Sequence, residues 1–162
     1  MSRPPLLLVD IDGVISLWGF PPDARPPGVW ALVDGIGHYL STTAADHLRA
    51  LAADFELVWC SGWEDKANQE LPLSIGIGPL PYLSFDRVPT PGNTHWKLGA
   101  IDQHAGDRPV AWIDDAFTPA CETWARQRSG PTLLVPTRPA SGLTAAETAV
   151  LRDWAQDLAL AV

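Results

Sequence analysis

The chain has 162 residues, 46% of them hydrophobic and 19% charged, a composition typical of one folded domain and not of a disordered chain. Its formal net charge of −8 argues against tight, sequence-independent binding to nucleic acid, because an acidic surface repels phosphate backbones. Two cysteines are too few for a disulfide framework, and no segment approaches the ~20 apolar residues that span a bilayer. We therefore expect reduced core thiols at Cys60 and Cys121 in a soluble, cytoplasmic protein without a membrane partner.

The first half of the chain alternates short apolar runs with helical patterns. Asp34-Gly35 between two apolar runs is a strong tight-turn signal and predicts a small hairpin. Thr43 with Asp46 resembles a capping box and predicts a helix start, and Pro72 predicts a helix end. The predicted elements are a strand at residues 6–9, a hairpin at 31–40, a helix at 43–53, a strand at 55–60 and a helix at 64–71.

The second half continues the alternation. Thr144 with Glu147 forms a second capping box and opens a last helix in which Leu151, Trp154 and Leu158 share one face with Val150. The other predicted elements are strands at residues 80–85, 109–113 and 132–135, and helices at 94–104 and 118–128. Strand–helix alternation of this kind predicts an α/β fold, a Rossmann-like three-layer sandwich with a five-stranded parallel sheet. We expect residues 1–162 to form a single domain.

Polar side chains follow the predicted strands at their carboxyl ends, the edge at which open parallel sheets bind ligands. They are Asp10 and Asp12 after the first strand, Ser61 and Gly62 after the second, Asp114 and Asp115 after the fourth, and Lys97 near the start of the helix after the third. We expect these groups to converge on one edge of the sheet.

Such a convergence of carboxylates requires a compensating charge. Two carboxylates about 4 Å apart repel by about 4 kcal/mol at an effective dielectric constant near 20. A divalent cation relieves that repulsion, and an all-oxygen site suits Mg²⁺, which commonly shares its coordination shell with a substrate phosphate. Lys97, Ser61 and the backbone N–H of Gly62 add the cation and the donors that a phosphoryl group needs.

The order of these motifs resembles the haloacid dehalogenase (HAD) superfamily. The chain carries DIDGV after a buried strand, a serine after the next strand, a lysine, and then an Asp-Asp pair after a later strand. The resemblance spans nearly the whole chain and is strongest to a compact phosphatase-type domain that also occurs in bacterial RNA-repair proteins. It implies an HAD-like fold and Mg²⁺-dependent phosphomonoester hydrolysis through an aspartyl-phosphate.

The resemblance also implies a role for each residue. Asp10 resembles the nucleophile, and Asp12 the general acid that protonates the leaving oxygen and later activates water. Ser61, with Gly62, and Lys97 resemble the phosphate-holding residues. The metal ligands it implies are Asp10, Asp12 (through its backbone carbonyl), Asp114 and Asp115, with the direct ligand of the last pair left open. An Asp at position 12 favours phosphatases over dehalogenases and ion pumps.

The gaps between motifs bear on the substrate. Neither the gap from Gly13 to Cys60 nor that from Trp63 to Trp96 leaves room for a separate cap domain, so we expect an open site with a small hairpin flap. An open site admits a large phosphorylated substrate, such as a nucleic-acid end, as well as a small one such as a nucleotide. A protein phosphatase acting on a partner chain and a non-catalytic binding module of the same fold are the alternatives, and the oligomeric state stays open.

Two aromatic residues beside the motifs have alternative interpretations. Trp63 follows the Ser61-Gly62 pair and either stacks on a base or sugar of the substrate or packs in the fold. His95 is either an acid–base group beside Lys97 or a histidine satisfied at a helix start. The other tryptophans for which we predict packing roles in the core or the strands are Trp18, Trp30, Trp59, Trp96 and Trp112.

Overall fold

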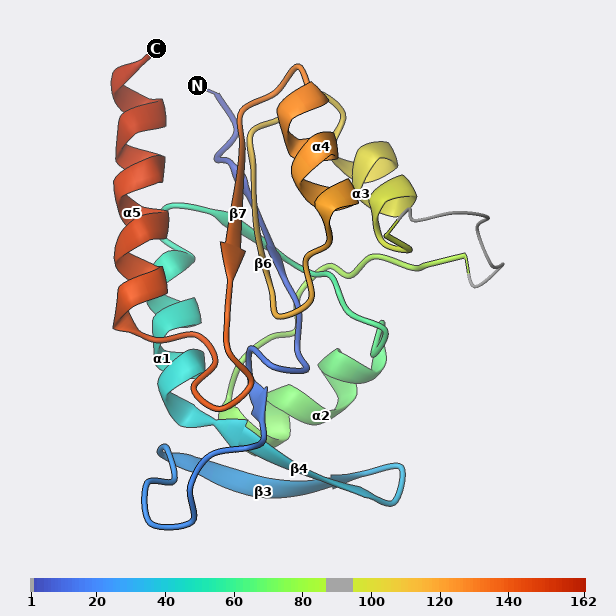
Figure 1. Ribbon diagram of the computed structural model, residues 1–162, viewed down its shortest axis with the longest axis vertical. Coiled ribbons are helices and arrows are strands. Elements are labelled where there is room, and N and C mark those ends of the chain that lie inside the picture. Colours follow the sequence, from blue (N-terminus) through green and yellow to red (C-terminus); the bar gives the residue numbers. More distant parts are fainter. Residues whose placement is uncertain (1, 87–94) are drawn as a thin grey trace.

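A parallel β-sheet lies at the centre of the computed structural model, which describes residues 2–86 and 95–162 (Figure 1). Its four strands run in the order β5-β1-β6-β7. They are β1 (Leu6–Val9), β5 (Glu56–Trp59), β6 (Val110–Asp114) and β7 (Thr132–Pro136). The helices are α1 (Thr42–Leu51), α2 (Lys66–Ile75), α3 (Leu98–Ala105), α4 (Pro119–Gln127) and α5 (Ala145–Leu160).

Helices cover both faces of the sheet. Because successive strand residues point to opposite faces, Leu7 and Val9 of β1 pack with α1, α2 and α5, whereas Leu6 and Leu8 pack with α3 and α4. All four of these side chains are fully buried, as are most apolar residues of β5 and β6. The continuous apolar runs in the sequence are therefore strands with two buried faces, as expected in a parallel α/β sheet.

A small antiparallel sheet lies at one end of the molecule, below the parallel sheet in Figure 1. It consists of β2 (Ser16–Leu17), β3 (Gly28–Val33) and β4 (Ile36–Ser41), in the order β2-β4-β3, and we call it the flap. The predicted hairpin is confirmed, since β3 and β4 pair across Asp34-Gly35. Both turn residues have positive φ, 51° and 78°, as a two-residue turn between twisted strands requires.

The parallel sheet has four strands, so the predicted fifth strand at residues 80–85 is wrong. This segment runs beside β5 but makes one isolated bridge, between Tyr82 and Trp59. The backbone N–H of Trp59 donates to the Pro81 carbonyl, and the Trp59 carbonyl accepts the backbone N–H of Leu83. Pro79 and Pro81 have no N–H to donate, so the segment cannot extend this contact into a regular ladder.

Several helix boundaries differ from the prediction. α2 continues through Pro72 to Ile75, because Leu71 and Ile75 bury the same helix face in the core and outweigh one lost backbone hydrogen bond. α1 is capped by Ser41, not Thr43, since the Ser41 hydroxyl accepts the N–H of Ala44 at 3.0 Å. The capping box that opens α5 is confirmed. The predicted start of α3 at Thr94 lies outside the described residues.

The tryptophans divide into buried and exposed groups. Trp59 and Trp112 are fully buried, as predicted. Trp18, Trp30 and Trp96 are 50%, 64% and 50% exposed and are not core residues, although Trp30 packs on Tyr39 within the flap strands and Trp96 packs on Phe85.

The two cysteines are buried free thiols, as predicted. Of the helices in the part of the chain that the structure describes, none is both long and apolar enough to cross a membrane.

Candidate functional site

Three carboxylates meet at the carboxyl edge of the parallel sheet. β1 and β6 are neighbours in register, so Asp10 follows Val9 directly beside the Asp114-Asp115 pair that ends β6. The Asp10 N–H donates to the Ile113 carbonyl at 3.1 Å and fixes this register at the edge. One carboxylate oxygen from each acid lies within 4.8 Å of the other two. Asp10 and Asp114 are buried and Asp115 is half-buried.

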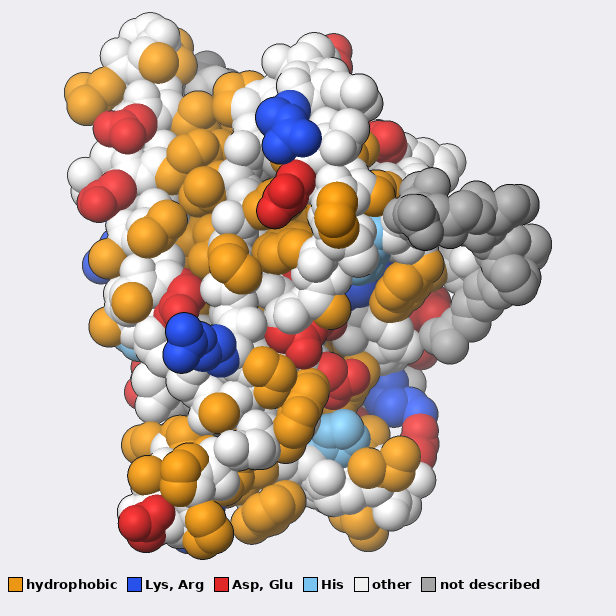
Figure 2. Space-filling view, viewed as in Figure 1, with side chains coloured by type: hydrophobic (Ala, Val, Ile, Leu, Met, Phe, Trp, Pro, Cys, Tyr) orange, Lys and Arg blue, Asp and Glu red, His pale blue; other side chains and the backbone are white. Residues whose placement is uncertain are grey.

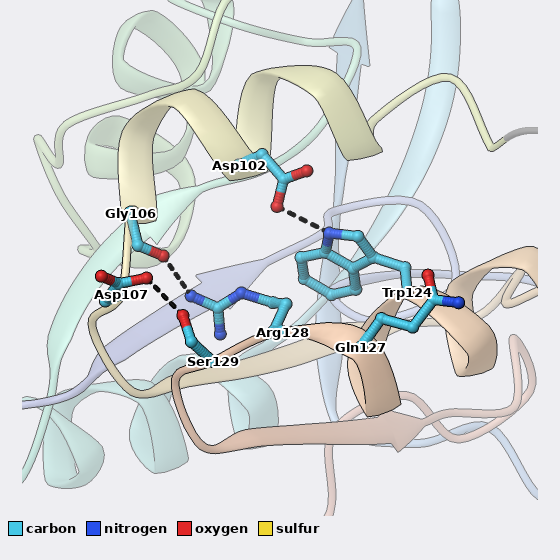
Figure 3. Close-up of a pocket in the computed structure, with 7 residues that line it drawn as sticks. All are labelled: Asp102, Gly106, Asp107, Trp124, Gln127, Arg128 and Ser129. Carbon is cyan, nitrogen blue, oxygen red and sulfur yellow. Dashed lines mark hydrogen bonds between the residues drawn. The ribbon is translucent and has the colours of Figure 1, made fainter.

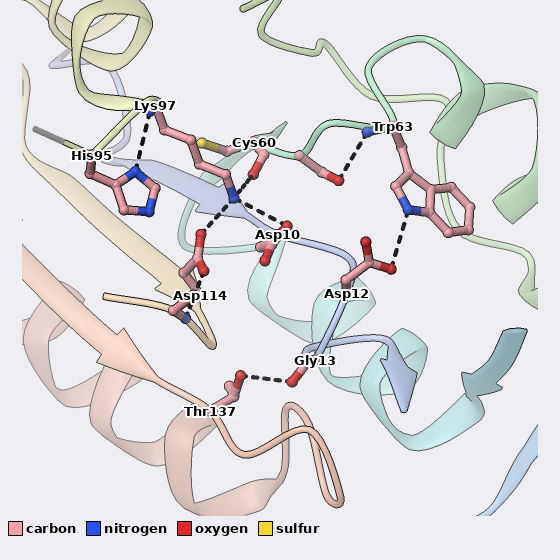
Figure 4. Close-up of polar contacts among 11 residues, drawn as sticks. Asp10, Asp12, Gly13, Cys60, Trp63, His95, Lys97, Asp114 and Thr137 are labelled. Carbon is pink, nitrogen blue, oxygen red and sulfur yellow. Dashed lines mark hydrogen bonds and ion pairs between the residues drawn. The ribbon is translucent and has the colours of Figure 1, made fainter. Parts of the chain in front are cut away.

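Lys97, at the start of α3, brings a buried positive charge into this group (Figure 4). Its Nζ lies 2.6 Å from Asp114 Oδ2 and 3.2 Å from Asp10 Oδ1, and it donates to the Cys60 carbonyl at 2.9 Å. All three contacts come from the carboxyl ends of different strands. The lysine is therefore a fixed part of the site and not a surface residue.

The titration behaviour of these groups follows from their burial. Burial raises the pKa of Asp10 to about 8, with Lys97 opposing and Asp114 reinforcing the shift. Burial raises the pKa of Asp115 too, again with a contribution from Asp114. For Lys97, burial acts to lower the pKa, but the nearby acidic groups, Asp10 first, outweigh it and raise the pKa overall.

The charge balance of the site fits a divalent cation. When ionised, the carboxylates of Asp10, Asp114 and Asp115 carry three negative charges, and Lys97 supplies one positive charge, so two negative charges remain. The three carboxylates could hold a metal ion, and their oxygens are the hard ligands that Mg²⁺ prefers.

Gly13 and Thr137 hold the loop that follows β1. A Cβ at Gly13 would lie 2.3 Å from Asp115 Oδ2, and Gly13 has φ +78°, so only glycine fits between this loop and the Asp115 carboxylate. The Thr137 hydroxyl donates to the Gly13 carbonyl at 2.8 Å, and the Thr137 N–H donates to the Asp114 carbonyl at 3.1 Å. Thr137 was not among the predicted site residues, although it directly follows β7 at the same edge.

The Asp12 side chain lies outside the three-carboxylate group and points away from Lys97 (Figure 4). Its carboxylate accepts a hydrogen bond from Trp63 Nε1 at 3.3 Å, and His38 Nδ1 lies 4.0 Å away. The rings of Trp63 and His38 meet edge to face at 4.8 Å, and the Ser16 hydroxyl shares a hydrogen bond with His38. A metal contact from Asp12 could therefore involve only its backbone carbonyl and stays a prediction.

His38 and Ser16 are two residues at the site that the sequence analysis did not single out. Both belong to the flap, and the bridge between Asp12 and Ser16 joins the flap to the loop that follows β1. No local motif marks them, because they reach Asp12 through pairing of β2 with β4. The Trp63 ring packs against the core, as one of its two interpretations predicted, and its Nε1–H donates to Asp12. Stacking on a substrate stays a prediction.

Ser61 and His95 make contacts that stabilise turns. The buried Ser61 hydroxyl accepts the Trp63 N–H at 3.2 Å, which leaves its own O–H able to donate to a phosphate oxygen. His95 Nδ1 accepts the Lys97 N–H at 3.2 Å, and burial lowers the pKa of His95. The His95 ring therefore accepts a hydrogen bond at the start of α3, as the second of its two interpretations predicted. Gly62 is exposed, and phosphate contacts from Ser61 and Gly62 stay predictions.

A separate pocket of about 320 Å³ lies at the opposite edge of the sheet, where β6 and β7 begin (Figure 3). Arg128 there donates to the hydroxyl of Thr132 and to the carbonyls of Gly106 and Arg108, and Trp124 donates to Asp102 at 2.7 Å. The guanidinium of Arg128 ties together the two loops that precede these strands. Its contacts account for it structurally, so the carboxyl edge remains the candidate site.

Comparison with known proteins adds no family assignment: neither models of protein families nor curated proteins give a match to this chain. What stands is an α/β domain with a four-stranded parallel sheet and a buried acidic triad at its carboxyl edge.

Proposed function

We propose that this protein is a Mg²⁺-dependent phosphomonoester hydrolase of the HAD type, with residues 1–162 as one capless domain. The observation that carries the proposal is the buried cluster of Asp10, Asp114, Asp115 and Lys97, with the exposed Asp12 only two residues from Asp10. A nucleophile, a general acid, a cation and a metal-ligand set are the parts that phosphoryl transfer through a carboxylate requires.

Asp10, Asp114 and Asp115 would hold the ion, together with the backbone carbonyl of Asp12. When bound, Mg²⁺ neutralises charge on the phosphoryl oxygens and on the carboxylates. Lys97, the Ser61 hydroxyl and the Gly62 N–H then orient the remaining phosphoryl oxygens, so that the phosphorus faces a carboxylate oxygen of Asp10.

The first step transfers the phosphoryl group to Asp10. A carboxylate oxygen of Asp10 bonds to phosphorus as the phosphorus–oxygen bond of the ester breaks, and Asp12 gives its proton to the leaving oxygen. The products are an alcohol and an aspartyl-phosphate. In the second step, Asp12 takes a proton from water, the water oxygen bonds to phosphorus, and the bond to Asp10 breaks. Inorganic phosphate leaves, and both aspartates return to their starting states.

The different surroundings of the two aspartates support this division of roles. The Asp10 side chain is 8% exposed and ion-paired, which holds a nucleophile in one position and keeps bulk water away. The Asp12 side chain is 52% exposed and oriented by Trp63, so it can meet both a leaving oxygen and an incoming water. Its exposure also fits an open site that admits a nucleotide or a nucleic-acid end.

The test is hydrolysis of p-nitrophenyl phosphate with Mg²⁺ and with EDTA, by wild type and by Asp10→Asn. We expect activity only with Mg²⁺ and a loss of roughly 10³-fold or more in Asp10→Asn, because the nucleophile is removed. Asp46→Asn, at an exposed aspartate of α1 that pairs with Arg49, is the matched control. Acid-quenched protein should carry a phosphoryl group on the peptide that contains Asp10, and equal rates for wild type and Asp10→Asn would refute the assignment.

A further inference from the structure

A pocket of about 480 Å³ opens between the flap and the loop that follows β2, beside Asp12. Its volume lies in the range of small-molecule sites. Its lining includes Asp12, Ser16 and His38 on one side and the aromatic residues Phe20, Trp30 and Tyr39. Apolar and aromatic side chains predominate, and the polar groups gather at the Asp12 side.

Aromatic rings form the walls of this pocket. Tyr39 pairs with Trp30 across β3 and β4, and its ring lies 5.1 Å from Trp30 and 5.1 Å from Phe20. Tyr39 is buried and its hydroxyl donates to the Pro26 carbonyl, so its ring is held in one position in the pocket wall. Trp18 and Trp30 remain largely exposed, which is unusual for apolar side chains of this size.

The surface around the pocket agrees with this description. In Figure 2, hydrophobic side chains gather over the lower part of the molecule, where Figure 1 places β3 and β4, and acidic side chains lie next to them. Trp30 and Leu32 of β3 are 64% and 73% exposed. An apolar aromatic surface thus adjoins the acidic site.

Asp12 belongs both to the pocket and to the proposed reaction. In an in-line transfer, the leaving oxygen departs on the side opposite the nucleophile, where the general acid stands. Asp12 is that acid under the proposed function, so the group attached to the leaving oxygen extends from Asp12. The pocket that Asp12 lines is the space available for it.

We infer that this pocket binds the base of a nucleoside, and that the substrate is a nucleoside monophosphate or a single terminal nucleotide. This inference rests on the proposed function. Aromatic side chains stack on the faces of any nucleobase, with about 1–3 kcal/mol per base. The Ser16 hydroxyl and His38, next to Asp12, provide polar partners near the sugar. The net charge of −8 disfavours a long polyanion but tolerates one phosphate held by Lys97.

The first test compares two substrates that differ only in the base, adenosine 5′-monophosphate and ribose 5-phosphate. We expect wild type to prefer the nucleotide in kcat/KM, and we expect Trp30→Ala to reduce the ratio of the two values by about 5- to 150-fold, the equivalent of one stacking contact. Trp30→Phe should restore most of the ratio, since it keeps a ring. Leu32→Ala, on the same face of β3 but outside the pocket lining, is the matched control and should keep the wild-type ratio.

An unchanged ratio in Trp30→Ala, or a wild-type preference for ribose 5-phosphate, would overturn the inference while leaving the phosphatase proposal intact. A second test needs no turnover: equilibrium dialysis of adenosine with Asp10→Asn, and with Asp10→Asn combined with Trp30→Ala. Binding that weakens at least 5-fold in the double variant supports the pocket even if no phosphatase activity is found. Equal binding, or none, by both proteins would contradict the pocket.

Discussion

The site has two parts with opposite physical character. One is a floor of Asp10, Asp114 and Lys97, whose side chains are between 2% and 8% exposed. The other is a rim of Asp12, Trp63 and His38, in which the Asp12 side chain is 52% exposed. Asp10 and Asp12 are two residues apart in the chain, yet one is enclosed by strand ends and the other faces solvent beside the flap.

Under the proposed function, this difference would separate two chemical tasks. In the floor, neighbouring strands and α3 hold opposite charges in contact, which keeps the reacting groups in place but depends on every charge being compensated. In the rim, one indole N–H and the flap orient a carboxylate that still reaches water. Under the proposed function, the floor would hold the reacting groups in place, and the rim would transfer protons and recognise the substrate.

The largest expected effect comes from removing the buried lysine of the floor, in comparison with an exposed lysine outside both parts. The chain has two lysines: Lys97 in the floor, and Lys66, which pairs with Asp34 at the exposed tip of the flap. Lys97→Met leaves two buried carboxylates uncompensated and should lower the free energy of unfolding by about 3–5 kcal/mol. Lys66→Met should cost less than about 1 kcal/mol, since its pair is exposed. Urea denaturation without metal, at a pH above the Asp10 pKa of about 8 so that this carboxyl is ionised, measures both values.

A second variant distinguishes the loss of the Lys97 charge from the loss of the packing of its side chain. In Lys97→Met with Asp10→Asn, one buried negative charge is gone as well, so part of the lost stability should return. If the double variant is no more stable than Lys97→Met, the lysine contributes through the packing of its chain, and the floor is not an electrostatic unit.

The rim is tested by Asp12→Asn. We expect kcat for an alkyl phosphate to fall by about 10²–10⁴-fold, because the leaving oxygen then departs without a proton. The loss should be much smaller for p-nitrophenyl phosphate, whose leaving group needs no proton. Stability should change by no more than about 0.5 kcal/mol, as usual for an exposed site. Equal losses on both substrates would contradict the general-acid role, and a large loss of stability would contradict the rim description.

The floor was predictable from the sequence because it depends on local patterns. Apolar runs that end in acids mark strand ends, and neighbouring parallel strands bring such ends together, so Asp10 and Asp114 were expected to meet. The rim was less predictable. His38 reaches Asp12 through the pairing of β2 with β4, and Trp63 reaches it from the loop after β5, which pairs with β1. Both contacts join segments that are distant in the sequence, and no local pattern contains them. The predicted strand at residues 80–85 was wrong for a local reason, since Pro79 and Pro81 limit its pairing with β5 to one bridge.

Metal binding gives a smaller effect that again separates the two parts. If Mg²⁺ binds the floor of the folded protein alone, it should stabilise wild type by about 2.7 kcal/mol at 100 times its dissociation constant. Asp115→Asn should remove most of this gain, because it removes one carboxylate of the triad. Asp12→Asn should keep the gain, since the substitution leaves the backbone carbonyl in place. Thermal unfolding over a Mg²⁺ series measures it, and loss of the gain in Asp12→Asn alone would place the ion at the rim.

The smallest expected effect tests whether the loss of stability on breaking an ion pair in the floor arises from burial of the charges or from ion pairing itself. Glu56 accepts hydrogen bonds from Arg108 at 2.8 Å and Arg3 at 3.1 Å near the amino ends of the strands, where the side chains are partly exposed. The hydrogen bond from Arg108 lowers the pKa of Glu56 below its usual 4.5. The stabilisation is therefore present above pH 4.5 and is lost as the pH falls through the lowered pKa. Glu56→Gln should cost less than about 1 kcal/mol at pH 7 and reduce the acid dependence of unfolding below pH 4.5. A cost comparable to that of Lys97→Met would mean that ion pairing itself, at any depth, holds this fold together.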